Sequence, residues 1–126
     1  MVKKVNKKIL IVEDDEDFIS ILKTKFTAEG FSVVTAADGE EGARQAEKEK
    51  PDLIFSDVLM PKMDGVAMAK KLKESDIKTP IIFLTNIKDQ NYIESLQKLG
   101  KFDYLIKSDL RISEIVDKAK KKLGLL

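Results

Sequence analysis

The chain has 126 residues, 36% of them charged, but 23 Lys and Arg against 22 Asp and Glu leave a formal net charge of only +1. This length suits one domain that buries a proper core, and the charge balance excludes a strong field toward nucleic acid or a membrane. The sequence has no Cys, which excludes disulfides and thiol chemistry, and no His, which removes imidazole as general base and as metal ligand. The apolar run at residues 9–12 is too short for a secretory signal or a membrane span, so we expect a cytoplasmic protein.

Short apolar runs alternate along the chain with longer amphipathic stretches. Five of the runs predict strands. Several are β-branched and apolar on both faces, as parallel strands covered by helices on each side are. The predicted strands are residues 8–12, 31–36, 52–55, 81–85 and 103–106.

The apolar spacing between and after these runs has the helical period and predicts five helices. Asp38 is expected to cap the second helix, on which Glu40 and Arg44 pair four residues apart, and Gly30 and Gly100 are expected to end the first and fourth. The predicted buried positions, helix by helix, are Phe18, Ile21, Leu22 and Phe26; Ala43 and Ala46; Val66, Met68, Ala69 and Leu72; Ile93, Leu96 and Leu99; and Ile112, Ile115, Val116, Ala119 and Leu123.

Five βα units with short connections predict one doubly wound α/β domain, a parallel sheet with helices on both faces. No linker, internal repeat or low-complexity segment interrupts the chain. We therefore expect a single domain over residues 1–126, with its core at about 7–123 and no output domain. In such folds, ligands bind beyond the carboxyl ends of the strands, near the switch in strand order.

The segment "DLIFSDVLMPKMDG" drives an apolar strand into the acid Asp57, at that ligand-binding edge. Several carboxylates a few ångströms apart repel one another or take up protons unless a cation neutralises them. Ligands that are all oxygen favour a hard ion, and Mg²⁺ is the predicted one. The ends of the other strands bring further side chains to the same edge: Glu13, Asp14, Asp15, Thr85 and Lys107.

Four segments, "ILIVEDD", "DLIFSDVLMPKMDG", "IIFLT" and "DYLIKSD", together resemble the receiver domain of bacterial two-component response regulators, over about residues 7–123. The resemblance implies a flavodoxin-like (βα)5 domain, like the chemotaxis receiver, with strand order 2-1-3-4-5. It also implies a signalling domain and not an enzyme, with chemistry confined to its own phosphorylation and dephosphorylation. The implied partner is a histidine kinase or a histidine phosphotransfer protein.

The resemblance also implies roles around the metal. Asp57 is similar to the acceptor that takes a phosphoryl group from a partner histidine. Asp14 and Asp15 resemble the acidic pair that holds Mg²⁺ with Asp57, with the backbone carbonyl of Leu59 as a further ligand. Glu13 is expected at most to reach the metal through a water. From the residues alone, Asp14 and Asp15 also fit a helix start, since acids favour the first turn.

Three further residues resemble the parts that respond to the phosphate. Lys107 is similar to the lysine that pairs with the acceptor and then with the phosphate. Thr85 resembles the hydroxyl that moves onto a phosphate oxygen, and Tyr104 the aromatic that fills the space it leaves, although Tyr104 also fits plain core. The expected docking face is formed by the fourth helix, fifth strand and fifth helix. It would serve partner docking or phosphorelay, in a monomer or a phosphorylation-dependent dimer.

The sequence departs from the family pattern near this face. Ser108 stands where the family has a proline after a cis bond, so the Lys107–Ser108 bond is either trans or a strained cis, which decides how Lys107 reaches the acceptor. Asn86 follows the switch threonine in place of a small residue and predicts narrower access to the phosphate. Lys101 and Phe102 replace a small residue and an acid, which predicts an individual partner face. Leu59 and Ile87, both apolar, predict slow self-dephosphorylation.

Other classes of protein fit less well. A Mg²⁺-dependent phosphatase with an aspartyl nucleophile needs that residue on the first strand and a cap domain. A flavin or nucleotide binder of the same fold needs a hydroxyl- or glycine-rich loop after the first strand, where "EDDED" repels phosphate. A degenerate receiver that never takes phosphate is the nearest competitor. The sequence is compatible with a free-standing receiver and with a piece of a larger regulator.

Overall fold

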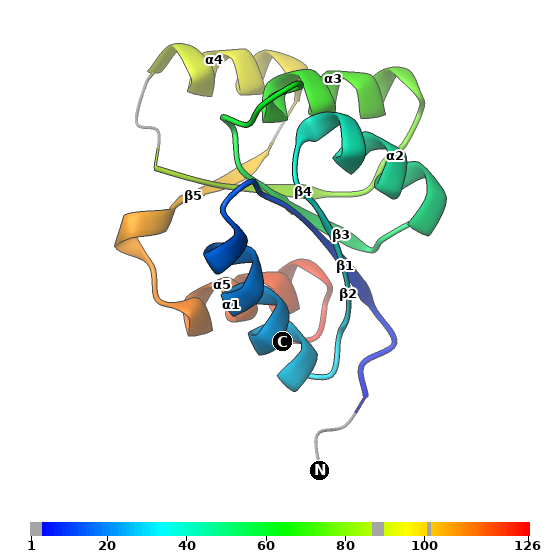
Figure 1. The fold of residues 1–126 in the computed structure, drawn as a ribbon, viewed down its shortest axis with the longest axis vertical. Coiled ribbons are helices and arrows are strands. Elements are labelled where there is room, and N and C mark those ends of the chain that lie inside the picture. The colour runs from blue at the N-terminus through cyan, green and yellow to red at the C-terminus, as the bar shows by residue number, and fades with distance from the viewer. Residues whose placement is uncertain (1–3, 87–89, 101) are drawn as a thin grey trace.

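The computed structural model describes residues 4–86, 90–100 and 102–126, and it has the architecture expected from the sequence. Five parallel strands form one sheet in the order β2-β1-β3-β4-β5. Helices α1 and α5 cover one face, and α2, α3 and α4 cover the other (Figure 1). The predicted doubly wound α/β fold and its strand order are therefore confirmed.

Three of the predicted strands have the predicted bounds, the second begins one residue later than predicted, and the third begins and ends one residue later. Phe31 is still tied to α1, because its N–H donates to the carbonyl of Phe26, and Asp52 precedes its strand. Ser56 extends the third strand toward the ligand-binding edge. The strands are β1 (Lys8–Val12), β2 (Ser32–Ala36), β3 (Leu53–Ser56), β4 (Ile81–Thr85) and β5 (Asp103–Ile106).

The helix ends follow local side-chain chemistry. Asp15, Asp38 and Asp64 cap the first three helices by accepting backbone N–H groups. Gly30 and Gly100 follow α1 and α4 with φ of 94° and 149°, as predicted for residues that end a helix. The helices are α1 (Glu16–Ala28), α2 (Gly39–Glu49), α3 (Gly65–Glu74), α4 (Gln90–Leu99) and α5 (Ile112–Lys122), with a short 3-10 turn at Lys107–Asp109.

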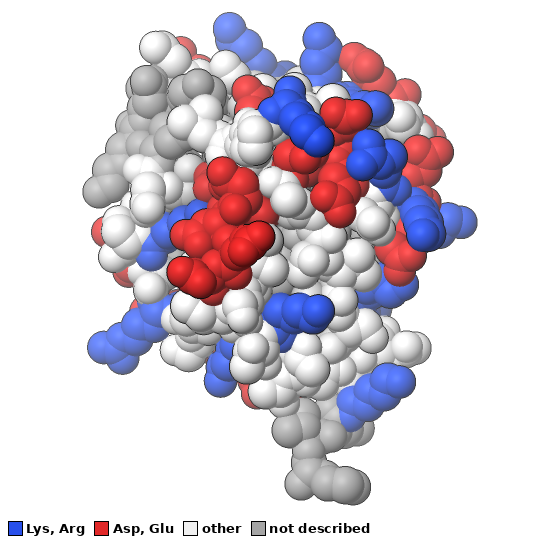
Figure 2. Space-filling model, viewed as in Figure 1, with Lys and Arg blue, Asp and Glu red and all other residues white. Residues whose placement is uncertain are grey.

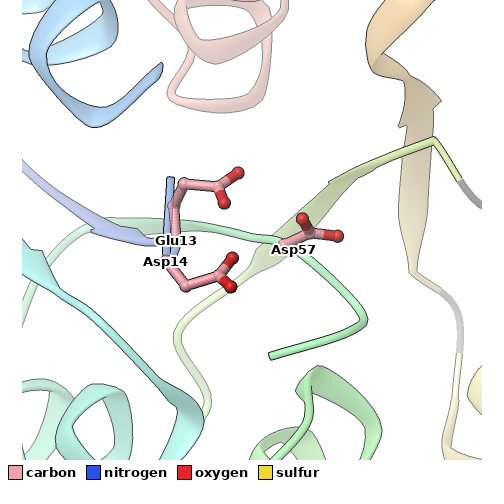
Figure 3. A group of neighbouring side chains, drawn as sticks. All are labelled: Glu13, Asp14 and Asp57. Atoms are coloured by element: carbon pink, nitrogen blue, oxygen red, sulfur yellow. The ribbon is translucent and has the colours of Figure 1, made fainter. Parts of the chain in front are cut away.

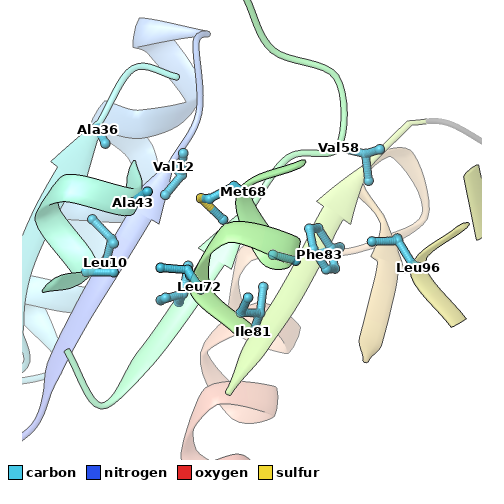
Figure 4. Close-up of a cluster of buried hydrophobic side chains, with 13 residues drawn as sticks. Leu10, Val12, Ala36, Ala43, Val58, Met68, Leu72, Ile81, Phe83 and Leu96 are labelled. Carbon is cyan, nitrogen blue, oxygen red and sulfur yellow. The ribbon is translucent and has the colours of Figure 1, made fainter. Parts of the chain in front are cut away.

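Each face of the sheet has its own apolar core, and Figure 4 shows the one under α2, α3 and α4. The predicted helix stripes are buried or half-buried except at Ile21, whose side chain is 51% exposed. Leu22 and Phe26 face the sheet, and Ile21 is turned away from them toward a groove shared with Ile112. The prediction that Ile21 belongs to the core was wrong. No helix in the described parts of the chain is both long and apolar enough to cross a bilayer.

Candidate functional site

Three carboxylates converge at the carboxyl ends of β1 and β3. These strands are neighbours, and Val12 lies opposite Ser56, so the residues that follow them emerge side by side. Carboxylate oxygens of Glu13, Asp14 and Asp57 all lie within 4.8 Å of one another (Figure 3). Glu13 is buried, Asp57 is half-buried and Asp14 is exposed, so the cluster opens to solvent on the side of Asp14.

Two of the three predicted metal-binding acids, Asp14 and Asp57, lie in this cluster, and its third member is Glu13. The N–H of Glu13 continues the sheet by donating to the Ala36 carbonyl, which keeps Glu13 at the strand end. Asp15 instead caps α1: its Oδ1 accepts the N–H groups of Asp17 and Phe18, at 3.0 and 3.3 Å. The helix cap thus uses the carboxylate of Asp15 and leaves Glu13 and Asp14 beside Asp57.

Lys107, which follows the edge strand β5, also reaches this cluster with its side chain. Its Nζ lies 2.9 Å from Asp57 Oδ2 and also contacts Glu13 Oε1. The same ammonium sits 4.5 Å from the centre of the Phe18 ring, in the range of a cation–π contact. No peptide bond among the described residues is cis, so the Lys107–Ser108 bond is trans, and Lys107 still contacts Asp57.

The buried charges shift one another's protonation. Burial raises the pKa of Glu13, and the hydrogen bonds from Lys107 and from the Asp15 N–H oppose that rise. Burial alone would lower the pKa of Lys107, but its bonds to Glu13 and Asp57 and their charges outweigh burial, so the pKa of the ammonium is raised. Lys107 is therefore a fixed positive charge at the centre of the acids.

The backbone around Asp57 is held from several sides. Its N–H donates to the Val12 carbonyl at 3.0 Å, and its Oδ1 accepts the Val58 N–H at 2.6 Å. The loop after it folds back so closely that a Cβ on Gly65 would lie 2.4 Å from the Asp57 carbonyl oxygen. Only glycine fits that approach. The Asp57 carboxylate is thus presented from a rigid support.

A second glycine fastens the same loop to α2. The Gly39 N–H donates to the Met63 carbonyl at 2.9 Å, and a Cβ on Gly39 would lie 2.2 Å from that oxygen. Sequence reasoning missed the supporting roles of Gly39 and Gly65. The signal was present in two Asp-Gly pairs, where each aspartate caps a helix and the following glycine permits the close contact.

Thr85 and Tyr104 lie on the α3–α4 face of the sheet. Phe83 pairs with Tyr104 and Thr85 with Ile106, so the alternation of side chains puts Thr85 and Tyr104 on one face of neighbouring strands. Thr85 is buried. Tyr104 is half-buried and lines a cavity of about 30 Å³ together with α4 residues such as Leu96.

The remaining predicted site residues lie in loops. Leu59 has a 47% exposed side chain two residues after Asp57, as a position beside an open site has. Ile87 and Lys101 lie outside the described residues. Acidic side chains gather on the surface in Figure 2, and the four consecutive acids from the cluster member Asp14 to Asp17 in the first turn of α1 are all exposed.

Comparison with known proteins defines the class to which this fold and site belong. The family model for the response regulator receiver domain matches residues 9–120, so the chain belongs to the receiver domains of two-component response regulators. It is similar to the alkaline phosphatase synthesis transcriptional regulatory protein PhoP of Bacillus subtilis, with 43% identity over 82% of this chain and 43% of that protein. A probable transcriptional regulator, ycf27, of Cyanophora paradoxa is 47% identical over 80% of this chain and 42% of its own length. The chain thus spans less than half the length of these relatives.

Solved structures agree with this class. The receiver domain of the Francisella response regulator 1452 is 33% identical and has a TM-score of 0.84 over 94% of this chain and 98% of that one. A CheY-like response regulator receiver domain protein from Methanospirillum hungatei is 27% identical and has a TM-score of 0.87 over 94% of both chains. The response regulators to which this family belongs are signalling proteins, so the chain is a signalling domain by family.

Proposed function

We propose that this domain accepts a phosphoryl group on Asp57 from a histidine of a partner kinase or phosphotransfer protein, in a Mg²⁺-dependent reaction. The observation that supports this most directly is the surroundings of Asp57. Two other carboxylates and one ammonium from distant parts of the chain meet at its side chain. Membership of the receiver family supports the same role.

The residues present fit a divalent cation. Three carboxylates and one ammonium leave a formal charge of −2 at the cluster, and the chain offers oxygen ligands without any His or Cys. Such a donor set suits Mg²⁺. We infer that Glu13, Asp14 and Asp57 would hold it, with the Leu59 carbonyl as a further ligand and Asp15 left to its helix. When bound, the ion would neutralise charge on the transferring phosphoryl group.

The chemistry asks the protein mainly for position and charge. An oxygen of Asp57 attacks phosphorus, the P–N bond to the partner imidazole breaks, and the bonding pair leaves with the imidazole, which takes a proton. Asp57 suits this role because its backbone and both its oxygens are held. Lys107, already beside Asp57, stabilises the charge that appears on the phosphoryl oxygens.

The phosphate would also be the signal. It adds about −1.5 to −2 charge at neutral pH, which is enough to bias an element with two arrangements. Thr85 and Tyr104 are the proposed element, since they share one face of β4 and β5 and Tyr104 contacts the α4 side. The face formed by α4, β5 and α5 would then dock a downstream protein or a second copy of the domain.

The proposed role is that of a cytoplasmic switch that acts on proteins, without an external substrate and without its own contact to nucleic acid or membrane. The chain aligns with less than half of relatives that are named as transcriptional regulators. In a longer protein the same face would control an output domain. The apolar side chain of Leu59 keeps the proposed phosphate long-lived, because it cannot orient an attacking water.

Intact mass is the test. The protein incubated with Mg²⁺ and acetyl phosphate should gain the mass of one phosphoryl group. Asp57→Asn should gain none, and Asp52→Asn, an acid at the other end of β3, should behave as wild type. Phosphorylation of Asp57→Asn, or none on the wild type, would contradict the proposal. Steady release of phosphate from simple esters would favour the phosphatase class instead.

A further inference from the structure

Asn86 and Ser108, which lie in different loops, are hydrogen-bonded to each other. The backbone N–H of Ser108 donates to Asn86 Oδ1 at 3.1 Å, across 22 positions of sequence. A proline at position 108 would have no N–H to donate. A small residue at position 86 would have no acceptor. The contact therefore depends on the residue type at both positions.

This contact lies just beyond the end of the β4–β5 ladder. The last backbone pair of these strands joins Thr85 to Ile106. Asn86 and Lys107 are the residues that follow this last pair, one after β4 and one after β5. The Asn86 side chain thus adds one more link between the two strands, and it attaches immediately after Lys107.

The place of this contact matters because the Lys107 side chain must extend across two strand spacings to reach Asp57. It follows β5, which is the edge strand, so β4 is its one neighbour in the sheet. Asp57 follows β3, two strands away, or about 10 Å at normal strand spacing. The Lys107 ammonium nevertheless lies 2.9 Å from Asp57 Oδ2. A side chain extended in this way loses less entropy if the backbone at its root is already fixed.

The hydrogen bond within the 3-10 turn holds the backbone at Lys107 only weakly. Within the 3-10 turn, the Leu110 N–H lies 3.4 Å from the Lys107 carbonyl, at the long end for a hydrogen bond. The Asn86 bond is shorter, at 3.1 Å, and comes from the residue that follows β4.

We propose that Asn86 is a positioning residue for Lys107: by accepting the Ser108 N–H, it fixes the backbone from which the ammonium reaches Asp57. This rests on the proposed function of Asp57 and adds to it a residue outside the reacting groups. The proposal also reverses an expectation from the sequence. If Asn86 mainly narrowed access to the phosphate, removing its side chain would speed phosphorylation, whereas a positioning role requires that phosphorylation slows.

The rate at which Asn86→Ala is phosphorylated decides between the two roles, because one predicts a faster and the other a slower reaction than in wild type. With Mg²⁺ and acetyl phosphate, Asn86→Ala should slow phosphoryl uptake by about three- to tenfold, the range expected for one lost hydrogen bond. The matched control is Asn6→Ala, at an exposed position before β1, which should leave the rate unchanged. A rate for Asn86→Ala equal to or above that of wild type would overturn the proposal.

A double mutant identifies the partner. Ser108→Pro removes the donor, so adding Asn86→Ala to it should slow the reaction no further. An equal slowing in both backgrounds would show that Asn86 acts through another contact, and the proposal would fail. Should Ser108→Pro not fold, Asn86→Asp takes its place. It keeps an acceptor oxygen, so it should retain slow hydrogen exchange at the Ser108 amide where Asn86→Ala loses it.

NMR separates this proposal from the proposed function. In Asn86→Ala the carboxyl carbon of Asp57 should shift as Lys107 withdraws, and the Ser108 amide should exchange faster. A purely structural role would lower thermal stability without moving the Asp57 signal, which would overturn the proposal. If wild type takes up no phosphoryl group, the function of Asp57 fails, and these two signals alone still decide whether Asn86 positions Lys107.

Discussion

The site joins two unlike parts of one sheet. Glu13 and Asp57 follow β1 and β3, which lie inside the sheet and are almost wholly buried. Tyr104 belongs to β5 and Lys107 follows it, at the edge, where all four strand residues are only half-buried. Strands with little burial and one neighbour open and shift at lower free-energy cost than central ones. The acid part is thus built to stay in place, and the β5 part to adjust, as the proposed acceptor and switch require.

The largest expected effect tests the fixed part. Glu13→Gln should weaken Mg²⁺ binding by about ten- to hundredfold, since even groups that only support metal ligands have effects of this size. Asp15→Asn is the matched control. Asparagine also caps a helix well, so this variant should keep both α1 and Mg²⁺ affinity. Calorimetric titration with Mg²⁺ measures the affinity of each variant. If Asp15→Asn loses as much affinity as Glu13→Gln, Asp15 also takes part in binding the metal.

This choice of acids shows where prediction from sequence stops. Asp57 and Lys107 could be placed at one edge because apolar runs mark strands and parallel strands end together. The end of β1 at Val12 was predicted correctly, but nothing in "VEDDED" says which of the following acids turn toward Asp57 and which one caps α1. In the structure Asp15 caps α1, a local interaction of the α1 N-terminus that the apolar pattern does not indicate.

Contacts between side chains and loops that are distant in the sequence were beyond prediction for a similar reason. The Phe18 ring beside Lys107 and the bond between Asn86 and Ser108 depend on side-chain rotamers and on the path of the chain after each strand. Phe18 was correctly placed on the inner side of α1, but helical period alone cannot separate a core contact from a contact with an ammonium. Ile21 was misplaced because a stripe only one residue too wide reaches solvent.

The next prediction concerns the link between the two parts. Lys107→Met leaves the carboxylates of Glu13 and Asp57 without their ammonium, so without Mg²⁺ the free energy of unfolding should fall by about 1–3 kcal/mol. Mg²⁺ should then raise the Tm of the variant more than that of wild type, because it binds a more negative cluster. Thermal unfolding with and without Mg²⁺ measures this.

Lys78→Met is the control for that comparison, since Lys78 is 87% exposed and makes a 4.0 Å contact at most with Asp76. Its Tm should stay near that of wild type, and so should the increase caused by Mg²⁺. If Mg²⁺ stabilises Lys107→Met no more than wild type, Lys107 and the metal do not share the same carboxylates.

A smaller effect is expected in the adjustable part. Thr85→Ala should still take up phosphate, because Thr85 is not the nucleophile, but it should lose most of the response of β5 and α4 and with it partner binding. The measurement is the change in NMR signals of Tyr104 and α4 when beryllofluoride, a phosphate mimic, is added with Mg²⁺. Thr79→Ala, before β4 and bonded to the Pro51 carbonyl, is the matched control. A full response in Thr85→Ala would remove Thr85 from the switch.

The smallest expected effect concerns a contact that ties the two parts together at the other end of the sheet. Glu29, which ends α1, lies 2.9 Å from Lys120 on α5. The hydrogen bond and charge of Lys120 lower the pKa of Glu29 below its ordinary value of 4.5. A folded-state pKa below the unfolded one stabilises the protein above the unfolded value, and this contribution disappears as pH falls through the folded value. The pair is partly exposed, so it is worth at most about 0.2–1 kcal/mol.

Glu29→Gln should therefore lower the free energy of unfolding slightly at neutral pH and leave it unchanged well below pH 4.5, where the carboxyl of the folded wild type is also protonated. Urea unfolding at both pH values measures the difference, and Glu47→Gln, exposed on α2, should show none at either. The neutral-pH difference should also shrink in high salt, which screens exposed charges. If Glu29→Gln lowers the free energy of unfolding equally at both pH values, the contact between Glu29 and Lys120 acts through packing instead of charge.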